Sequence, residues 1–239
     1  MKILIVNDDS ITAPGIAMLA QTALSFGDVY VVAPASECSA MSQKLTLRET
    51  MLLEKVEDFP VKVRAAYRLG GTPVDCVKVA LEYILEEKPD CVLSGINNGY
   101  NVGYDIAYSG TVGAAFEAVR CGVPAMAFSV ASNSHLEAAK PYLADVLREL
   151  MEAEPEANTV WNVNFPALGT KPLAGMFRDC PVAPVSLYRE NYEPQLLLEV
   201  GGEILTCRGI PTPNSSIPVG TDAHAVRNGY ISVSKIRWG

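Results

Sequence analysis

The sequence predicts an α/β fold built on a parallel, doubly wound sheet, and three features of the 239 residues support this prediction. Short apolar runs typical of buried strands occur throughout the first two thirds of the chain. Segments with apolar residues at helical spacing lie between them. After Pro166 the pattern changes to strand-like runs separated by glycine and proline. Apolar strands joined by crossover helices are typical of a parallel sheet with helices on both faces.

The amino-terminal residues predict a strand, a turn, a helix and a second strand. The run from Lys2 to Val6 has the apolar character of a buried strand. From Ile16 onward, apolar residues recur at i, i+3, i+4, i+7 and i+8, and Pro14 suits a first helical turn. Residues 29–33 form the next apolar run, which Pro34 ends.

The middle of the chain repeats this alternation. Thr72 is expected to cap a helix, with Pro73 at its first position and Asp75 at its third. The sequence then predicts a strand at 91–93, a glycine-rich loop at 95–110, a helix at 111–120, a strand at 125–130, a helix at 136–150 and a strand at 160–165.

The carboxyl-terminal part predicts an antiparallel β appendage. Strands are expected at 195–200 and 203–207 around the Gly201-Gly202 turn, and a closing strand at 229–234. We therefore divide the chain into a core at 1–170 and an appendage at 171–239 that belongs to the same domain. The appendage is expected to pack on the sheet or to exchange with another subunit, and so to serve oligomerisation.

Composition excludes several classes of protein. With 27 acidic and 19 basic residues the net charge is −8, which argues against a nucleic-acid polymer as ligand because Lys and Arg drive that binding. Only two histidines and no zinc-binding cysteine spacing leave little material for a zinc site. We find no signal peptide and no apolar run of the roughly 20 residues that span a bilayer. With six dispersed cysteines, these features predict a cytoplasmic protein that does not bind membranes.

Oxygen-bearing side chains follow several of the predicted strands. Ligands of open α/β sheets bind beyond the carboxyl ends of the strands, where Asp8, Asp9, Ser39 and Asn97 are expected. Two carboxylates, a hydroxyl and a carboxamide suit a hard cation such as Mg²⁺ or Mn²⁺. The alternative is a solvated turn at the two aspartates, with Ser39 and Asn97 bonded to local backbone.

A second candidate site precedes the helix predicted at 111–120. Ser109, Gly110 and Thr111 could direct backbone N–H groups and hydroxyls at an anion, as in a phosphate cradle. The alternative is an ordinary helix cap with a glycine that a tight turn requires. The segment matches neither the Walker A loop nor the GxGxxG dinucleotide pattern.

Taken together, these segments resemble one known family, the SurE (survival protein E) nucleotidases. The resemblance runs in order from residue 1 to about residue 234 and rests on Asn7-Asp8-Asp9, Ala13-Pro14-Gly15, Val31-Val32-Ala33-Pro34 with Ser39, Gly71-Thr72-Pro73-Val74-Asp75-Cys76-Val77, Ser94-Gly95-Ile96-Asn97, Tyr108-Ser109-Gly110-Thr111-Val112, Gly220-Thr221-Asp222 and Gly229-Tyr230-Ile231-Ser232. Each motif is weak alone, whereas their ordered conjunction is highly specific.

The resemblance implies a Rossmann-like, metal-dependent phosphomonoesterase that hydrolyses nucleoside 5'- and 3'-monophosphates and, in some members, short polyphosphate. By position, it places one divalent metal on Asp8, Asp9, Ser39 and Asn97. It places phosphate contacts on Asn101, Ser109, Gly110 and Thr111. It also implies a homodimer or homotetramer in which carboxyl-terminal segments reach a neighbouring subunit.

The chain departs from the family pattern at a few positions. Ser10 and Ala40 stand where the family usually has glycine, so both turns are expected to sit differently. Ala35-Ser36 replaces an Asp-Arg pair, and Tyr104 replaces an aspartate.

The resulting hypothesis is hydrolysis by a metal-activated water, with Asp8 or Asp9 available to accept its proton. Two alternatives stay open: a phosphatase for another small phosphoester or short polyphosphate, and a nucleotide-binding module that has lost turnover.

Overall fold

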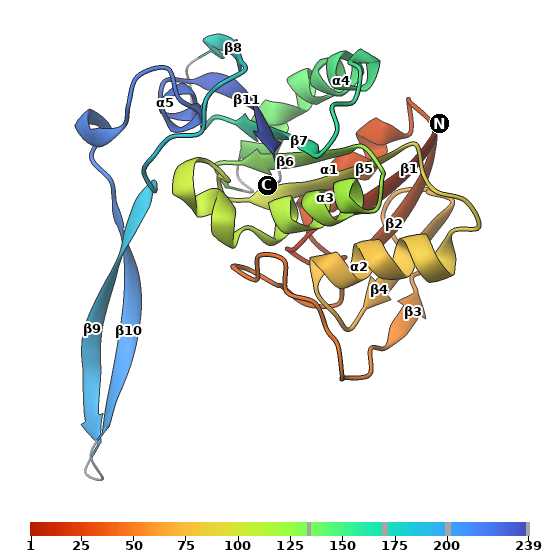
Figure 1. Ribbon diagram of the computed structural model, residues 1–239, viewed down its shortest axis with the longest axis horizontal. Helices are drawn as coiled ribbons and strands as arrows, with labels where there is room; N and C mark the ends of the chain where they lie inside the picture. The colour runs from red at the N-terminus through yellow and green to blue at the C-terminus, as the bar shows by residue number, and fades with distance from the viewer. Residues whose placement is uncertain (133–134, 169–171, 199–201, 238–239) are drawn as a thin grey trace.

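A computed structural model describes residues 1–132, 135–168, 172–198 and 202–237, and it confirms the α/β fold class. One mixed sheet runs through the body of the molecule (Figure 1). Its described strands are, in spatial order, β3 (Leu53–Lys55), β4 (Ala65–Leu69), β2 (Asp28–Pro34), β1 (Lys2–Val6), β5 (Cys91–Asn98), β6 (Ala125–Val130), β7 (Thr159–Phe165), β11 (Tyr230–Arg237) and β8 (Gly175–Arg178).

The strands from β4 to β7 are all parallel, as the crossover pattern predicts. The edges of the sheet are mixed, because β3 is antiparallel to β4, and β11 is antiparallel to β7 but parallel to β8. The strands β3, β4 and β8 are findings that the sequence did not predict. β3 and β8 are short, with 3 and 4 residues, whereas β4 has 5 residues, as β1 does, and directly precedes α2 in the strand–helix alternation.

Helices cover both faces of the sheet and complete three layers (Figure 1). On one face, α1 (Pro14–Ala23) and α4 (Leu136–Glu152) pack on a core that includes Ile3 and Ile5. On the other, α2 (Pro73–Val79) and α3 (Gly110–Arg120) pack on a core that includes Leu4 and Val6. Successive side chains of β1 thus enter opposite cores, as the two-residue period of a strand requires.

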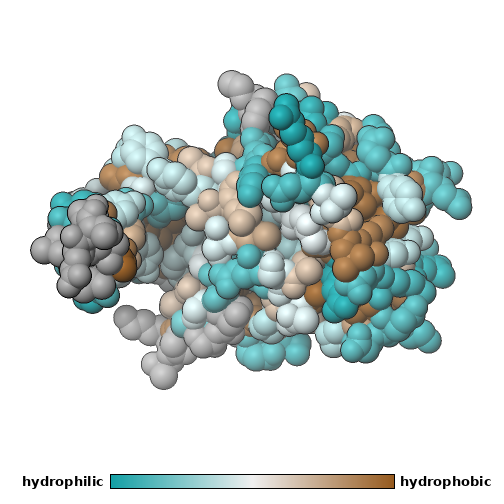
Figure 2. Space-filling view, turned by 90° about the horizontal axis from the view of Figure 1, so that it is seen from below, coloured by the Kyte–Doolittle hydropathy of each residue, from teal (hydrophilic) through white to brown (hydrophobic). Residues whose placement is uncertain are grey.

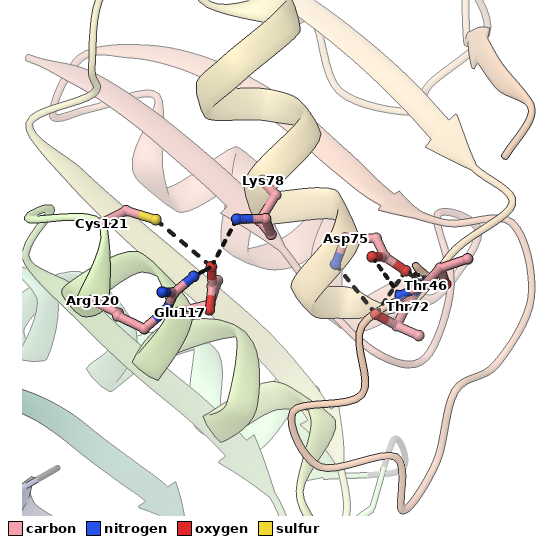
Figure 3. A network of polar contacts seen from close by, with 7 residues as sticks. All are labelled: Thr46, Thr72, Asp75, Lys78, Glu117, Arg120 and Cys121. Atoms are coloured by element: carbon pink, nitrogen blue, oxygen red, sulfur yellow. Dashed lines mark hydrogen bonds and ion pairs between the residues drawn. The ribbon is translucent and has the colours of Figure 1, made fainter. Parts of the chain in front are cut away.

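The capping box predicted for α2 is present. The Thr72 hydroxyl accepts the Asp75 N–H at 3.2 Å, and the Asp75 carboxylate accepts the Thr72 N–H at 2.9 Å. The helix then continues as a π-helical turn, η1 (Ala80–Ile84). Asp75 also accepts the backbone N–H of Thr46 at 3.0 Å and its hydroxyl at 2.6 Å (Figure 3). This cap therefore holds the loop before β3 against α2.

A buried carboxylate joins α2 to α3. Glu117 accepts hydrogen bonds from Arg120 at 2.6 Å and from Lys78 of α2 at 3.5 Å (Figure 3). Burial raises the pKa of Glu117, but the bonds and charges of Arg120 and Lys78 outweigh burial and hold that pKa below its ordinary value. The two helices therefore approach each other with their charges paired.

The predicted hairpin is present and longer than expected. Strands β9 (Tyr188–Leu198) and β10 (Gly202–Pro211) pair with each other alone and extend away from the body (Figure 1). Residues 199–201, which include the last two residues of the strand predicted at 195–200 and the first glycine of the turn, lie outside the described residues. The chain then returns through the 3-10 turn η4 (Asn214–Ser216) and the helix α5 (Asp222–Arg227), which the sequence did not predict.

The residues after 170 therefore divide between two places in the fold. The strands β8 and β11 lie in the main sheet, whereas β9 and β10 project from it. The role of this region in oligomerisation stays a prediction.

In the part of the chain that the structure describes, we find no helix long and apolar enough to cross a bilayer.

Candidate active site

A cavity of about 660 Å³ lies beyond the carboxyl ends of β1 and β5 and extends to the base of the β9–β10 hairpin. Five of the eight predicted site residues line it, namely Asp8, Ser39, Asn97, Asn101 and Ser109. Asp9, Gly110 and Thr111 do not line it but contact residues that do. Another cavity, of about 440 Å³, lies among Met1, Cys91 and Trp161, and it contains none of the predicted residues.

Asp8 is the most constrained carboxylate of the cavity. It follows β1 directly, and its two oxygens accept the Thr111 hydroxyl at 2.5 Å and the Thr111 N–H at 3.1 Å. Burial, with a further contribution from the charge of Asp9, raises the pKa of Asp8 to about 6. Gly110 permits this approach, since a Cβ there would lie 3.0 Å from the Asp8 Cβ. The start of α3 is therefore bound to the end of β1 through Asp8.

Thr111 is hydrogen-bonded to Asp8 in this structure. Both its hydroxyl and its N–H donate to Asp8. Ser109 is the N-cap of α3 and accepts the Val112 N–H at 3.1 Å, as the helix-cap interpretation expects. Because Ser109 also lines the cavity, its own hydroxyl proton remains available to a ligand. A contact of either residue with phosphate stays a prediction.

Asp9 lies beside the cavity and is held by β5. Its carboxylate accepts the Asn98 N–H at 2.7 Å. Burial, and then the charge of Glu37, raise the pKa of Asp9 above its ordinary value. Glu37 also accepts the Ser39 hydroxyl at 2.6 Å, so a third carboxylate that the sequence interpretation missed lies next to the predicted oxygen set.

Asn97 lies at the end of β5, which is longer than the predicted strand. Its side-chain N–H donates to the carbonyl of Gly99 at 2.7 Å. With the nitrogen committed, the carbonyl oxygen is the atom that this side chain can offer to a cation. The backbone of α1 at Gly15 packs directly against the backbone of β5 beside Asn97. A Cβ on Gly15 would lie 2.1 Å from the carbonyl oxygen of Ile96, so only glycine permits this contact.

Asn101 is fixed by side chains of neighbouring strands. Its N–H donates to Asn164 at 2.8 Å, and its carbonyl accepts Asn162 at 2.7 Å and Asn164 at 3.1 Å. Its side-chain N–H donates to Ser129 at 2.9 Å. These supporting residues lie in β6 and β7 and are buried, and periodicity alone did not distinguish them from core positions. The network presents Asn101 to the cavity in one orientation.

The two positions where glycine was expected keep a glycine-like backbone. Ser10 has φ of +87° and Ala40 has φ of +55°, both in the left-handed region. The turns therefore keep a positive φ without glycine, at roughly 1–2 kcal/mol of backbone strain each. Asn7 supports the first turn by donating to the carbonyl of Ser10 at 2.7 Å.

The donor set fits a hard divalent cation. Asp8 and Asp9 are neighbouring carboxylates with raised pKa values, and among the described residues neither forms an ion pair with Lys, Arg or His. Ser39 and Asn97 add neutral oxygens beside Asp8 at the cavity wall. The described residues contain no group of three or more His, Cys, Asp and Glu that could hold a metal. A metal here therefore depends on those neutral oxygens as well as on the aspartates.

The remaining walls were not identified from the sequence. Asp105 lines the cavity and accepts the Leu187 N–H at 2.9 Å. Aromatic side chains also contribute, from the loop after β5, from the 3-10 helix η2 (Gly103–Tyr108) and from β9; they are Tyr100, Tyr108, Tyr188 and Tyr192. One sequence feature could have indicated the residues from β9. Tyr188, Glu190 and Tyr192 are spaced two apart, which places their side chains on one face of a strand.

Comparison with known proteins places this site in a family. The model of the family described as Survival protein SurE matches residues 3–184. The chain is 38% identical to the 5'-nucleotidase SurE of Geobacter sulfurreducens, over 99% of this chain and 87% of that protein. It is 37% identical to the 5'-nucleotidase SurE of Thermoanaerobacter sp. (strain X514), over 100% of this chain and 92% of that protein.

The fold agrees with a solved relative. A crystal structure of the SurE protein from Aquifex aeolicus superposes with a TM-score of 0.83 at 33% identity and covers 99% of this chain and 93% of that one. Sequence and fold thus agree over nearly the whole length. The chain belongs to the survival protein SurE family.

Proposed function

We propose that this protein is a divalent-metal-dependent phosphomonoesterase that hydrolyses nucleoside 5'-monophosphates, and also 3'-monophosphates, to nucleoside and phosphate. The observation that carries the proposal is the carboxylate pair after β1: Asp8 is buried and lines one cavity with the neutral oxygens of Ser39 and Asn97, and the half-buried Asp9 lies beside that cavity. The relatives named 5'-nucleotidase SurE support the choice of substrate.

Asp8, Asp9, Ser39 and Asn97 would hold the cation. A bound Mg²⁺ or Mn²⁺ would supply charge to the phosphoryl oxygens and lower the pKa of a coordinated water. Asn101 and Ser109, which line the same cavity, bind and orient the phosphoryl oxygens. Thr111 keeps the Asp8 carboxylate in one orientation, and Gly110 leaves room for that approach. Asp8 or Asp9 accepts the proton of the attacking water.

The test compares wild type with Asp8→Asn and Asn97→Ala on p-nitrophenyl phosphate and on nucleoside 5'-monophosphates, with Mg²⁺ or Mn²⁺. Loss of a group that stabilises charge in the transition state is expected to lower kcat by about 10²- to 10³-fold for Asp8→Asn. EDTA should abolish the wild-type activity. Asp145→Asn is the matched control, because Asp145 is exposed on α4 and pairs with Arg148. Wild-type rates in both site variants would overturn the assignment.

A panel of phosphoesters separates this proposal from the other two classes. Faster hydrolysis of a sugar phosphate or of short polyphosphate would indicate another phosphatase. Nucleotide binding without phosphate release would indicate a module without turnover. The positive φ kept at Ser10 and Ala40 supports turnover, since both turns retain the backbone that glycine would give them.

We also propose that the chain forms a homodimer or homotetramer in the cytoplasm. Leu205 is 55% exposed and Ile204 48% exposed on the projecting hairpin. Figure 2 shows brown, apolar surface beside teal, polar surface at the left, where the projecting part lies. Because an isolated two-stranded hairpin is marginally stable in water, a second copy is the expected cover. All six cysteines are free thiols, which supports a reducing compartment. Light scattering on the full chain measures the assembly, and a monomer at micromolar concentration would contradict it.

A further inference from the structure

One face of β9 carries a distinct set of side chains. Tyr188, Glu190 and Tyr192 alternate along the strand and all line the cavity that contains Asp8 and Ser109. The residues between them belong to the other face, where Asn191 donates to Glu193 at 2.9 Å and Arg208 of β10 lies 3.9 Å from Glu193. The two faces of the strand are therefore chemically different, and only one of them faces the cavity.

The partner strand leaves the rings of this face uncovered. Cross-strand neighbours share a face of the ribbon, and opposite Tyr188, Glu190 and Tyr192 lie Pro211, Gly209 and Cys207. Gly209 has no side chain, and the Tyr188 ring lies 3.5 Å from where its Cβ would be. Tyr192 is 65% exposed and Tyr188 50% exposed. Such small neighbours leave aromatic surface that a flat ligand can cover.

The cavity changes in character along its length. Asp8, Asn97, Asn101 and Ser109 make one end polar and suited to a metal and a phosphoryl group. At the hairpin the lining consists of the rings of Tyr188 and Tyr192 and the carboxylate of Glu190, and Tyr100 and Tyr108 of the body line the same cavity. Tyr100 is held there because its hydroxyl accepts the Ala167 N–H at 2.8 Å. A ligand that spans both ends must join an anion to a planar ring.

We propose that Tyr188, Glu190 and Tyr192 form the base-recognition element of the substrate site, with the two tyrosines stacking on the nucleobase and Glu190 accepting its N–H groups. This inference rests on the proposed nucleotidase function and adds specificity to it. A carboxylate has acceptors only, so it favours a base with neighbouring donors. Guanine presents an N1–H beside an amino group and matches both oxygens, whereas cytosine offers its amino group alone. The element therefore selects guanosine monophosphates.

The test measures kcat and KM for guanosine 5'-monophosphate, cytidine 5'-monophosphate and ribose 5-phosphate, which has the sugar and the phosphate but no base. Tyr188→Ala and Tyr192→Ala are each expected to raise KM for both nucleotides about tenfold, since stacking of a base on an aromatic side chain contributes about 1–3 kcal/mol. The KM for ribose 5-phosphate should change less than twofold in the same variants. Tyr192→Phe should restore the wild-type KM because it keeps the ring.

Glu190→Gln is expected to lower the preference for guanosine over cytidine monophosphate about tenfold, with ribose 5-phosphate unaffected. Glu193→Gln and Asn191→Ala are matched controls on the opposite face of β9 and should behave as wild type. If these variants impaired the hydrolysis of ribose 5-phosphate as much as that of the nucleotides, the hairpin would act on the sugar or on the fold. That result would overturn the proposal. Unchanged KM in both alanine variants would overturn it as well.

A binding measurement separates this proposal from the proposed function. Guanosine lacks the phosphate, so its affinity, measured by calorimetry, reports the base-recognition element alone. If wild type hydrolyses no phosphomonoester, the proposed function fails, while guanosine binding that Tyr192→Ala weakens would still support the element. Equal guanosine affinity in wild type and Tyr192→Ala would overturn the element even in an active enzyme.

Discussion

The central sheet and the β9–β10 hairpin are both β structure, yet different interactions hold them. Every residue of β6 is buried, and side chains on the two faces of the sheet enter two separate cores. All but one of the β10 residues are exposed, and the hairpin pairs only with itself. Burial of apolar side chains thus stabilises the strands of the sheet in addition to their backbone hydrogen bonds. The hairpin has the hydrogen bonds but little burial, so its stability depends on the surfaces that it contacts. Both regions contribute to the candidate site: the polar residues around Asp8 belong to the body, and the hairpin adds Tyr188, Glu190 and Tyr192.

The largest expected difference between the two regions comes from removing apolar side chains. Phe128→Ala in β6 deletes a fully buried ring and is expected to lower the free energy of unfolding by about 3–5 kcal/mol. Leu205→Ala in β10 should change it by less than about 0.5 kcal/mol where the chain is diluted to a monomer, because Leu205 is largely exposed in the single chain, and by more in the proposed assembly. Urea denaturation measures both. A cost above 1 kcal/mol for Leu205→Ala that depends on protein concentration would show that a second copy covers the hairpin.

A pair of glycines tests the same contrast by adding a methyl group. Gly15→Ala would place a Cβ 2.1 Å from the carbonyl oxygen of Ile96, which is backbone, and is expected to destabilise the protein by about 2–3 kcal/mol. Gly209→Ala in β10 would meet Tyr188 at 3.5 Å, an ordinary contact, and should be within about 0.5 kcal/mol of wild type. Thermal unfolding at equal concentrations compares them. Equal losses in the two variants would contradict the view that only the body is close-packed.

A substitution at the junction between the two regions, where Asp222 begins α5, is expected to have an intermediate effect on stability. Asp222 is fully buried and accepts the N–H groups of Gly103 at 2.9 Å, Ala183 at 2.8 Å and Ala223 at 2.7 Å. Asp222→Asn puts an NH₂ group against one of these donors and should lower stability by about 1–3 kcal/mol. Asp179→Asn is an exposed control. Hydrogen exchange should show faster exchange at Gly103 and Ala183, and unchanged protection there would rule out this role.

The smallest expected effect comes from the strained turns beside the site. Ser10→Gly and Ala40→Gly remove the cost of a positive φ but add backbone freedom to the unfolded chain, so each should stabilise by at most about 1 kcal/mol. The melting temperature measures this gain, and Ala114→Gly, inside α3, is the control that should lose stability. A loss of stability in both turn variants would show that the side chains of Ser10 and Ala40 contribute more than the strain costs.

Much of the body was predictable because its signals are local. The apolar run of β1, the helical spacing after Pro14 and the capping box at Thr72 are each encoded within about ten residues. Order along the chain then placed Asp8 and Asn97 at the same edge of the sheet, because parallel strands end there together. The elements that were missed, β3, β4, β8 and α5, have only 3 to 6 residues each, so each contains fewer than three full periods of its own pattern.

The sequence by itself determined the doubly wound sheet, the family and the oxygen-bearing residues at the strand ends, since these depend on local periodicity and on order along the chain. Only the tertiary structure decided that Thr111 binds Asp8, that Glu37 meets Ser39 and that β9 reaches the cavity. Each of these contacts joins segments whose relative position depends on packing or on a turn conformation. Their partners are chosen by distance and orientation in space, which residue spacing does not encode.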